Sequence, residues 1–196
     1  LAAYGGSNDV FVATWYDQSG NSNDATMNSS GSRPKIYDGS TGVLVDANGK
    51  PIVEFTSTLK ELRIPTAAAS STMFAFSVFK TNDLITEQGV YNFNGKGSIS
   101  LNRNANGVIC MRSGNLGASG TTATPHLVAA NHGTAIFIDG AQATTSLSGR
   151  QSNNDSMGRV GGFRFDGFVQ ELILYASGTS DDADIQTNMN DFYQVY

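Results

Sequence analysis

Short runs in which apolar and polar residues alternate recur along most of the chain. A period of two residues is typical of β-strands that bury one face, because successive side chains point to opposite sides of a sheet. The strongest run spans residues 73–80, where Phe74, Phe76 and Val78 share one face. The other runs span residues 33–38, 42–55, 89–93, 98–103, 107–112, 126–131, 134–145 and 168–175. We expect one or two short strands in each.

Residues 10–16, VFVATWY, predict a further strand, which carries Phe11, Ala13 and Trp15 on one face. Its other face is also largely apolar, so we expect this strand to be buried on both sides. Tight turns are expected at the Asn-Gly pairs 48–49 and 106–107. The Asp139-Gly140 pair lies between two apolar runs and predicts a two-residue hairpin.

Only the C-terminal stretch has a helical pattern. We expect a short helix that begins at a capping residue, Thr179 or Ser180, and has Asp181 and Asp182 in its first turn, where the helix dipole favours negative charge. One face of this helix would carry Ile185, Met189 and Phe192 or Tyr193 at helical spacing. This face is expected to pack on the sheets.

The sequence therefore predicts an all-β fold, a two-sheet antiparallel β-sandwich with one short C-terminal helix. The composition agrees, since 22 glycines and many Asn, Ser and Thr residues suit a protein rich in turns. We find no linker and no repeat, and expect residues 1–196 to form a single domain.

Charge narrows the range of partners. The net charge is −5, the pI is about 4.8, and no cluster of Lys or Arg exists, which argues against nucleic acid and anionic membranes as ligands. No apolar stretch approaches 18 residues, so no membrane span is predicted. Cys110 is the one cysteine, which excludes an internal disulfide, and we expect it to be a small core residue. Neutral ligands such as sugars remain compatible.

The polar stretch that follows Trp15 and Tyr16 is the most distinctive part of the chain. It reads DQSGNSND over residues 17–24. Asp17, Asn21 and Asp24 are candidates for a structural Ca²⁺ site, because calcium prefers clustered oxygen ligands. Two carboxylates alone bind calcium weakly, and the spacing differs from that of a dedicated calcium loop.

We favour a second interpretation of this stretch, in which it is a structural corner. Asp17, Asn21 and Asn23 would then hydrogen-bond to the backbone nearby and hold a tight turn. Trp15 and Tyr16 would anchor that turn in the core.

Three stretches carry a resemblance to known families. Residues 15–25, WYDQSGNSNDA, followed by RPKI at 33–36, resemble the catalytic-domain family of fungal B-type α-L-arabinofuranosidases. They also resemble laminin-G-like domains of bacterial surface proteins and phage virion proteins. Residues 134–142 and 158–185 resemble the hairpin and the closing part of laminin-G-like, concanavalin-A-like jelly rolls. An Arg-rich strand region usually precedes the matching part in this group, which implies a fragment of a longer chain whose missing strand comes from elsewhere.

The resemblance does not extend to the catalytic residues. A retaining glycosidase needs two carboxyl groups about 5 Å apart. The stretch that resembles the nucleophile strand, residues 98–112, contains no Asp or Glu. Where the family places its acid/base Asp, after a Gly-Gly pair, this chain has Phe163, and Asp166 belongs to the next turn. The family's Cys pair is also missing, so we expect no enzymatic activity.

Other polar residues give weaker signals. His126 and His132 have no companion nucleophile or metal spacing, and we expect them to be surface residues or satisfied polar residues. Aromatic, amide and guanidinium groups on strands that form the cleft of the resembled enzymes are candidates for ligand binding. These candidates are Tyr91, Asn92, Asn102, Arg103, Arg112, Phe163 and Phe165. The alternative is that the neighbouring asparagines only shape hairpin turns.

The leading hypothesis is a non-catalytic, lectin-like module on an extracellular or virion surface, such as a phage tail, fibre or head appendage. It would adhere to surface glycans or decorate the particle, as a homo-oligomer or a part of a larger assembly. The alternatives are a glycoside hydrolase related to the arabinofuranosidases and a purely structural assembly domain. No cofactor is expected beyond the possible Ca²⁺.

Overall fold

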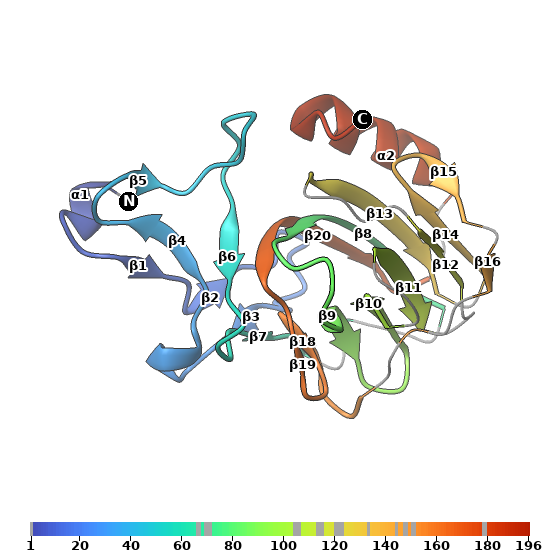
Figure 1. The fold of residues 1–196 in the computed structure, drawn as a ribbon, viewed down its shortest axis with the longest axis horizontal. Helices are drawn as coiled ribbons and strands as arrows, with labels where there is room; N and C mark the ends of the chain where they lie inside the picture. Colours follow the sequence, from blue (N-terminus) through green and yellow to red (C-terminus); the bar gives the residue numbers. More distant parts are fainter. Residues whose placement is uncertain are drawn as a thin grey trace.

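The fold is a two-layer sandwich of antiparallel β-sheets, as the alternating pattern predicts (Figure 1). The computed structural model describes residues 2–65, 68, 72–103, 107–112, 116–119, 124–132, 134–143, 145–146, 149, 152–177 and 180–196. The Asn106 half of the expected Asn-Gly turn and Thr179 lie outside these residues.

The first sheet is built around the two long strands in its middle. In spatial order it contains β1 (Val10–Phe11), β4 (Lys35–Asp38), β6 (Val53–Phe55), β20 (Gly167–Tyr175), β8 (Phe74–Thr81), β13 (His126–Asn131), β14 (Ala135–Ile138) and β15 (Ala141–Gln142). A short strand, β5 (Gly42–Val43), pairs with β4. The expected hairpin is present between β14 and β15, where Asp139 and Gly140 have φ values of 51° and 77°.

The second sheet faces the first. Its strands, in spatial order, are β16 (Thr145–Ser146), β12 (Leu116–Ser119), β11 (Val108–Arg112), β10 (Gly97–Leu101), β9 (Gln88–Phe93), β17 (Ser156–Met157), β7 (Leu62–Arg63), β3 (Ala25–Thr26) and β2 (Thr14–Trp15). A small hairpin joins β18 (Arg159–Val160) to β19 (Phe163–Arg164). Two short helical turns are α1 (Ala2–Gly5) and a 3-10 turn at Ser30–Ser32.

Apolar side chains from both sheets fill the space between them. Phe55, Phe79, Ile99 and Phe165 are fully buried there, and Cys110 is also buried. Burial of this many large side chains is the main stabilising contribution to the sandwich.

A second cluster lies on the outer face of the first sheet, beneath α2 (Asp182–Tyr193). Met189 is buried against this face, and Ile185 and Tyr193 pack beside it, whereas Phe192 is 53% exposed. The helix thus covers the outer face of β8 and β13 as its periodicity predicts. The N-cap of the helix is Asp181, not Thr179 or Ser180, and the first helical residue is Asp182.

The prediction of one buried strand over residues 10–16 is wrong. The segment forms two separate pairs, β1 with β4 in the first sheet and β2 with β3 in the second. Phe11 is 41% exposed, and the chain between the two pairs crosses from one sheet to the other. Apolar alternation alone cannot distinguish a strand from such a crossing.

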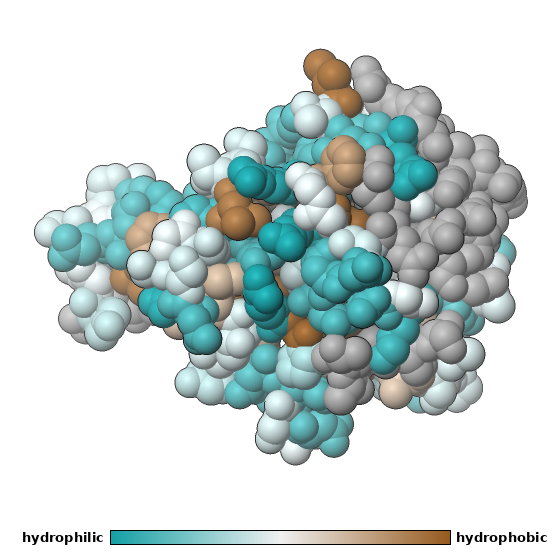
Figure 2. All heavy atoms as spheres, turned by 90° about the horizontal axis from the view of Figure 1, so that it is seen from below, coloured by the Kyte–Doolittle hydropathy of each residue, from teal (hydrophilic) through white to brown (hydrophobic). Residues whose placement is uncertain are grey.

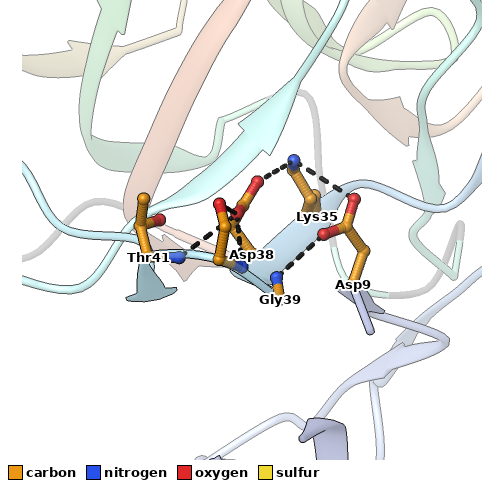
Figure 3. Close-up of polar contacts among 6 residues, drawn as sticks. Asp9, Lys35, Asp38, Gly39 and Thr41 are labelled. Atoms are coloured by element: carbon orange, nitrogen blue, oxygen red, sulfur yellow. Dashed lines mark hydrogen bonds and ion pairs between the residues drawn. The ribbon is translucent and has the colours of Figure 1, made fainter. Parts of the chain in front are cut away.

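β1, β4 and β5 project beside the sandwich, to the left in Figure 1, and the visible surface of this projection is mostly hydrophilic (Figure 2). An ion pair ties its strands together, with Lys35 Nζ 3.0 Å from Asp38 Oδ2 and 3.4 Å from Asp9 Oδ2 (Figure 3). The hydrogen bond from Lys35 to Asp38 raises the pKa of the lysine. The pKa of Asp38 is lowered, first by the Ser40 hydroxyl and amide, then by Lys35.

Candidate functional site

A pocket of about 660 Å³ opens between the two sheets, where β6 separates from β20. β6 pairs with β20 only at Gly167–Val169, and a bulge follows at Gln170. From Glu171 to Tyr175, β20 pairs with β8 on one side, and the described strands leave its other side unpaired. The bulge lies in the pairing of β20 with β8, which continues on both sides of Gln170.

The floor of the pocket is apolar. Leu172 and Leu174 of β20 meet Ile64 and Met157 from the other sheet, and all four belong to the main core or pack against it. Trp15 adds a half-buried ring at the same place. The pocket is therefore an opening into the sandwich core.

The polar loop at residues 16–23 forms one wall, and its shape is fixed by Asp17. The Asp17 Oδ1 accepts the Ser19 amide at 2.8 Å, and Oδ2 accepts the Ser19 hydroxyl at 2.8 Å and the Asn23 amide at 3.0 Å. Asp24 Oδ1 in turn accepts the Asp17 amide at 2.8 Å. The hydrogen bonds that the Asp17 carboxylate accepts, the one from the Asn23 amide above all, lower the pKa of Asp17. The loop is thus a structural corner of the kind the polar residues predict.

Two details of that prediction need correction. The Asn21 side chain donates to the Ser19 hydroxyl at 2.9 Å instead of bonding to the backbone, and Asn23 contributes its backbone amide, which donates to Asp17. Tyr16 does not anchor the corner in the core, because the strand ends at Trp15 and the tyrosine ring is 66% exposed. Trp15 alone packs against the core.

The candidate calcium ligands lie together in this loop, but their oxygens already serve the protein. Both Asp17 oxygens and one Asp24 oxygen accept N–H or O–H donors from the loop itself. A calcium ion would compete with these donors for the lone pairs of the same oxygens. Within the described ranges, no group of three or more His, Cys, Asp or Glu residues is placed to hold a metal. The arrangement fits a hydrogen-bonded corner better than a metal site.

Glu171 and Tyr193 form the opposite wall, beside α2. Both side chains line the pocket, and the interaction of the Tyr193 hydroxyl with the Glu171 carboxylate lowers the pKa of the glutamate. Burial has the larger effect and raises the pKa of Glu171 overall, and burial followed by the charges of Glu171 and Asp46 raises the pKa of Tyr193. Asp17 and Glu171 are the charged members of the described lining, which includes no Lys, Arg or His. The pocket therefore favours neutral or cationic ligands.

The structure does not bring the sequence-predicted ligand residues together at this pocket. Tyr91 is buried in the core, where its hydroxyl lies 3.1 Å from His132 Nε2, and burial raises its pKa. Asn92 is buried beside it and donates to the carbonyls of Ser152 and Asn154. Neither side chain is accessible to a ligand, because the strand that carries them is buried on both faces.

The remaining described candidates also lie outside the pocket lining. Asn102 donates to the carbonyls at 83 and 86, accepts the amide at 107, and so shapes a turn. Phe165 is fully buried in the core, so its ring cannot stack on a ligand. Phe163 and Arg103 are half-buried outside the pocket, and the side chain of Arg112 lies outside the described residues.

Both histidines are buried and hydrogen-bonded, so they are satisfied polar residues and not surface ones. His126 is buried, with Nδ1 2.7 Å from Asp139 Oδ2, and Asp139 Oδ1 also accepts the Leu127 amide. His132 is buried against Tyr91. Sequence reasoning missed Gln170, Glu171 and Tyr193 as site residues. The signal available was the Gln-Glu pair that interrupts an otherwise apolar strand.

Comparisons with known proteins leave the family of the chain open. No protein-family model and no curated protein matches it. Among solved structures, it is similar to botulinum neurotoxin type C, described as depending on interaction with two ganglioside molecules to enter cells, with a TM-score of 0.45 over 97% of this chain and 53% of that one. It is also similar to the binding domain of botulinum neurotoxin serotype G, with a TM-score of 0.42 over 92% and 51%.

Both similarities have 11% sequence identity. The chain spans about half the length of these two neurotoxin chains. The laminin-G and arabinofuranosidase families therefore remain resemblances. No helix of the described residues is long and apolar enough to cross a membrane.

Proposed function

We propose that this chain is a non-catalytic carbohydrate-binding module and that the loop at residues 16–23, at the mouth of the pocket, is its binding site. One observation carries this proposal. The loop presents the exposed ring of Tyr16 together with the polar side chains of Gln18, Ser19 and Asn21, on a backbone held by the Asp17 carboxylate.

This combination suits a sugar. A pyranose or furanose ring has an apolar C–H face, which packs on an aromatic ring, and an edge of hydroxyl groups, which need donors and acceptors. Amide and hydroxyl side chains supply both kinds of group. Because the loop is already ordered, binding loses little conformational entropy.

A glycan array tests this proposal, run with the recombinant protein with and without EDTA. We expect binding to a defined class of glycans that EDTA does not abolish. Tyr16→Ala should weaken that binding about tenfold, since one aromatic contact contributes about 1–1.5 kcal/mol. Tyr4→Ala is the matched control, because Tyr4 is 85% exposed on α1, away from the pocket. Equal loss in both variants, or no glycan bound at all, would contradict the proposal.

One observation favours a second candidate function, a glycoside hydrolase. Asp17 and Glu171 line the same pocket, and their pKa values move in opposite directions, as an acid and a base would require. The engagement of both Asp17 oxygens by the loop argues against a nucleophile there. Turnover of 4-nitrophenyl α-L-arabinofuranoside that Glu171→Gln abolishes would establish the hydrolase. We expect no turnover.

We further propose that the module acts on an extracellular or virion surface, as part of a larger assembly. The support is the resemblance of residues 15–25 to domains of surface and virion proteins, together with a polar, weakly charged sequence. Antibodies against the domain should label intact particles or cells in immunogold microscopy. Labelling that appears only after permeabilisation would contradict this location.

A further inference from the structure

One edge of β20 is left without a partner by the strands in the described part of the chain. On one side, Glu171–Tyr175 pairs residue by residue with β8, from Val78 to Phe74. On the other side, the pairing with β6 stops at Val169, and the described strands provide no partner beyond it. Alternate amide and carbonyl groups of this segment therefore point into the pocket without a ladder partner. An unpaired edge of this kind is a template for another strand.

The side chains along this edge alternate between the two apolar clusters on either face of the sheet. Leu172 and Leu174 face the main core, whereas Ile173 packs in the cluster under α2. The edge thus lies between two apolar layers. A neighbouring strand would bury one face on the sandwich core and the other beside Tyr193.

A second observation concerns Gln170, at the bulge where β6 departs. Its side chain is 8% exposed and lines the pocket, and its Nε2 donates to Asp46 Oδ2 at 3.2 Å. Its Oε1 is buried and accepts no hydrogen bond. Buried acceptors in folded proteins nearly always have a donor. An amide or guanidinium group entering the pocket would supply one after a small movement of this side chain.

Charge indicates which kind of strand fits. The described lining carries the carboxylates of Asp17 and Glu171 and no basic side chain. Burial makes the Glu171 carboxylate costly to keep ionised, and a cation placed beside it relieves this cost. Apolar residues on the core face and basic residues on the face beside Glu171 therefore complement the site.

We propose that the free edge of β20 at residues 170–175 accepts an extended polypeptide segment with alternating apolar and basic residues as an added β-strand. The added strand completes the first sheet between β6 and β20 and closes the opening into the core. Main-chain hydrogen bonds give such strand addition its affinity, and the alternating side chains give its specificity. It uses the backbone of β20, so it is independent of glycan binding by the exposed side chains of the loop at 16–23.

The single tryptophan provides a reporter, because Trp15 lines the pocket and is the one Trp of the chain. The probe is a seven-residue peptide of alternating valine and arginine, blocked at both ends, titrated into the full chain. We expect a saturable change in tryptophan emission and new hydrogen-exchange protection of alternate amides in residues 170–175. The same peptide N-methylated at alternate residues keeps its side chains but loses backbone donors, and should not bind.

Two variants separate the charge contribution from the backbone. Glu171→Gln should weaken binding of the valine-arginine peptide about fivefold, the usual size of one partly exposed ion pair. Asp191→Asn, which removes one charge from an exposed position of α2, should leave it unchanged.

Three results would overturn the proposal. One is equal binding of the methylated peptide. Another is an absence of both the emission change and the amide protection. The third is protection of these amides in the free protein that increases with its concentration, which would assign the edge to a second copy of this chain.

Discussion

At the scale of single residues, the loop at 16–23 depends on one carboxylate. Asp17 accepts three hydrogen bonds from residues two and six positions ahead, so it fixes the backbone that carries the exposed polar side chains. Asp and Asn residues commonly form such local bonds at turns, which is why the sequence could predict the corner. The exposure of Tyr16 could not be predicted, because the alternating pattern does not reveal where the strand ends.

Acid should release the loop. The hydrogen bonds to Asp17 hold its folded-state pKa below the ordinary value of 3.8. A depressed pKa of this kind stabilises the fold above the unfolded-state pKa, and the contribution is lost as the pH falls through the folded-state pKa. In a carboxyl-carbon NMR titration we expect Asp17 to titrate below 3.8, with the Ser19 and Asn23 amide shifts changing together with it. A midpoint at or above 3.8 would contradict the hydrogen bonds.

Glu171 should behave in the opposite way. Burial raises its folded-state pKa above the ordinary 4.5, so the folded state binds more protons than the unfolded state between the two values. Stability should therefore fall as the pH rises through this window and stay reduced at pH 7. Glu171→Gln keeps the shape of the side chain and an oxygen acceptor near Tyr193. The substitution should raise the free energy of unfolding more at pH 7 than at pH 4. Urea unfolding at both pH values measures this, and an equal effect at both would contradict the assignment.

At the scale of elements, the main strands and the helix follow from local sequence patterns. Where each strand ends is decided by contacts between residues that are distant in the sequence. β8 and β20 were predictable because long alternating runs have few alternatives to a strand. The bulge at Gln170 and the early end of the pairing with β6 were not, because they depend on partner strands that are distant in the sequence, β8 and β6. The pocket results from that departure, and for this reason no local motif indicates it.

The hairpin of β18 and β19 gives a test of close packing between elements. Gly158 has a φ of 93°, and a Cβ there would lie 2.5 Å from the Phe55 ring and 2.6 Å from the Lys60 carbonyl oxygen. Gly158→Ala should therefore reduce the free energy of unfolding by about 2–4 kcal/mol, through backbone strain and overpacking. Gly162→Ala in the same hairpin meets nothing within 4 Å and should change it by less than about 0.5 kcal/mol. Chemical denaturation measures both, and similar values would contradict this packing.

At the scale of the whole molecule, the fold class was predictable. Of the candidate site, the polar loop was predictable and its position beside β20 and α2 was not. Composition, turns and alternation together specify a β-sandwich. The polar loop was recognisable from its sequence, but it forms a site only because folding places it against β20 and α2. The burial of Tyr91, Asn92, Asn102 and Phe165 was not predictable, because buried polar and aromatic groups look like ligand groups in a sequence.

The proposed function depends on glycan binding by the exposed side chains of the loop at 16–23. Amide chemical-shift mapping with a glycan selected on the array tests this most directly. We expect the largest changes at the Trp15 indole and the amides of residues 16–23, and one dissociation constant for all of them at saturation. Changes confined to the turn around Asn102 and Arg103, with the loop unaffected, would contradict it.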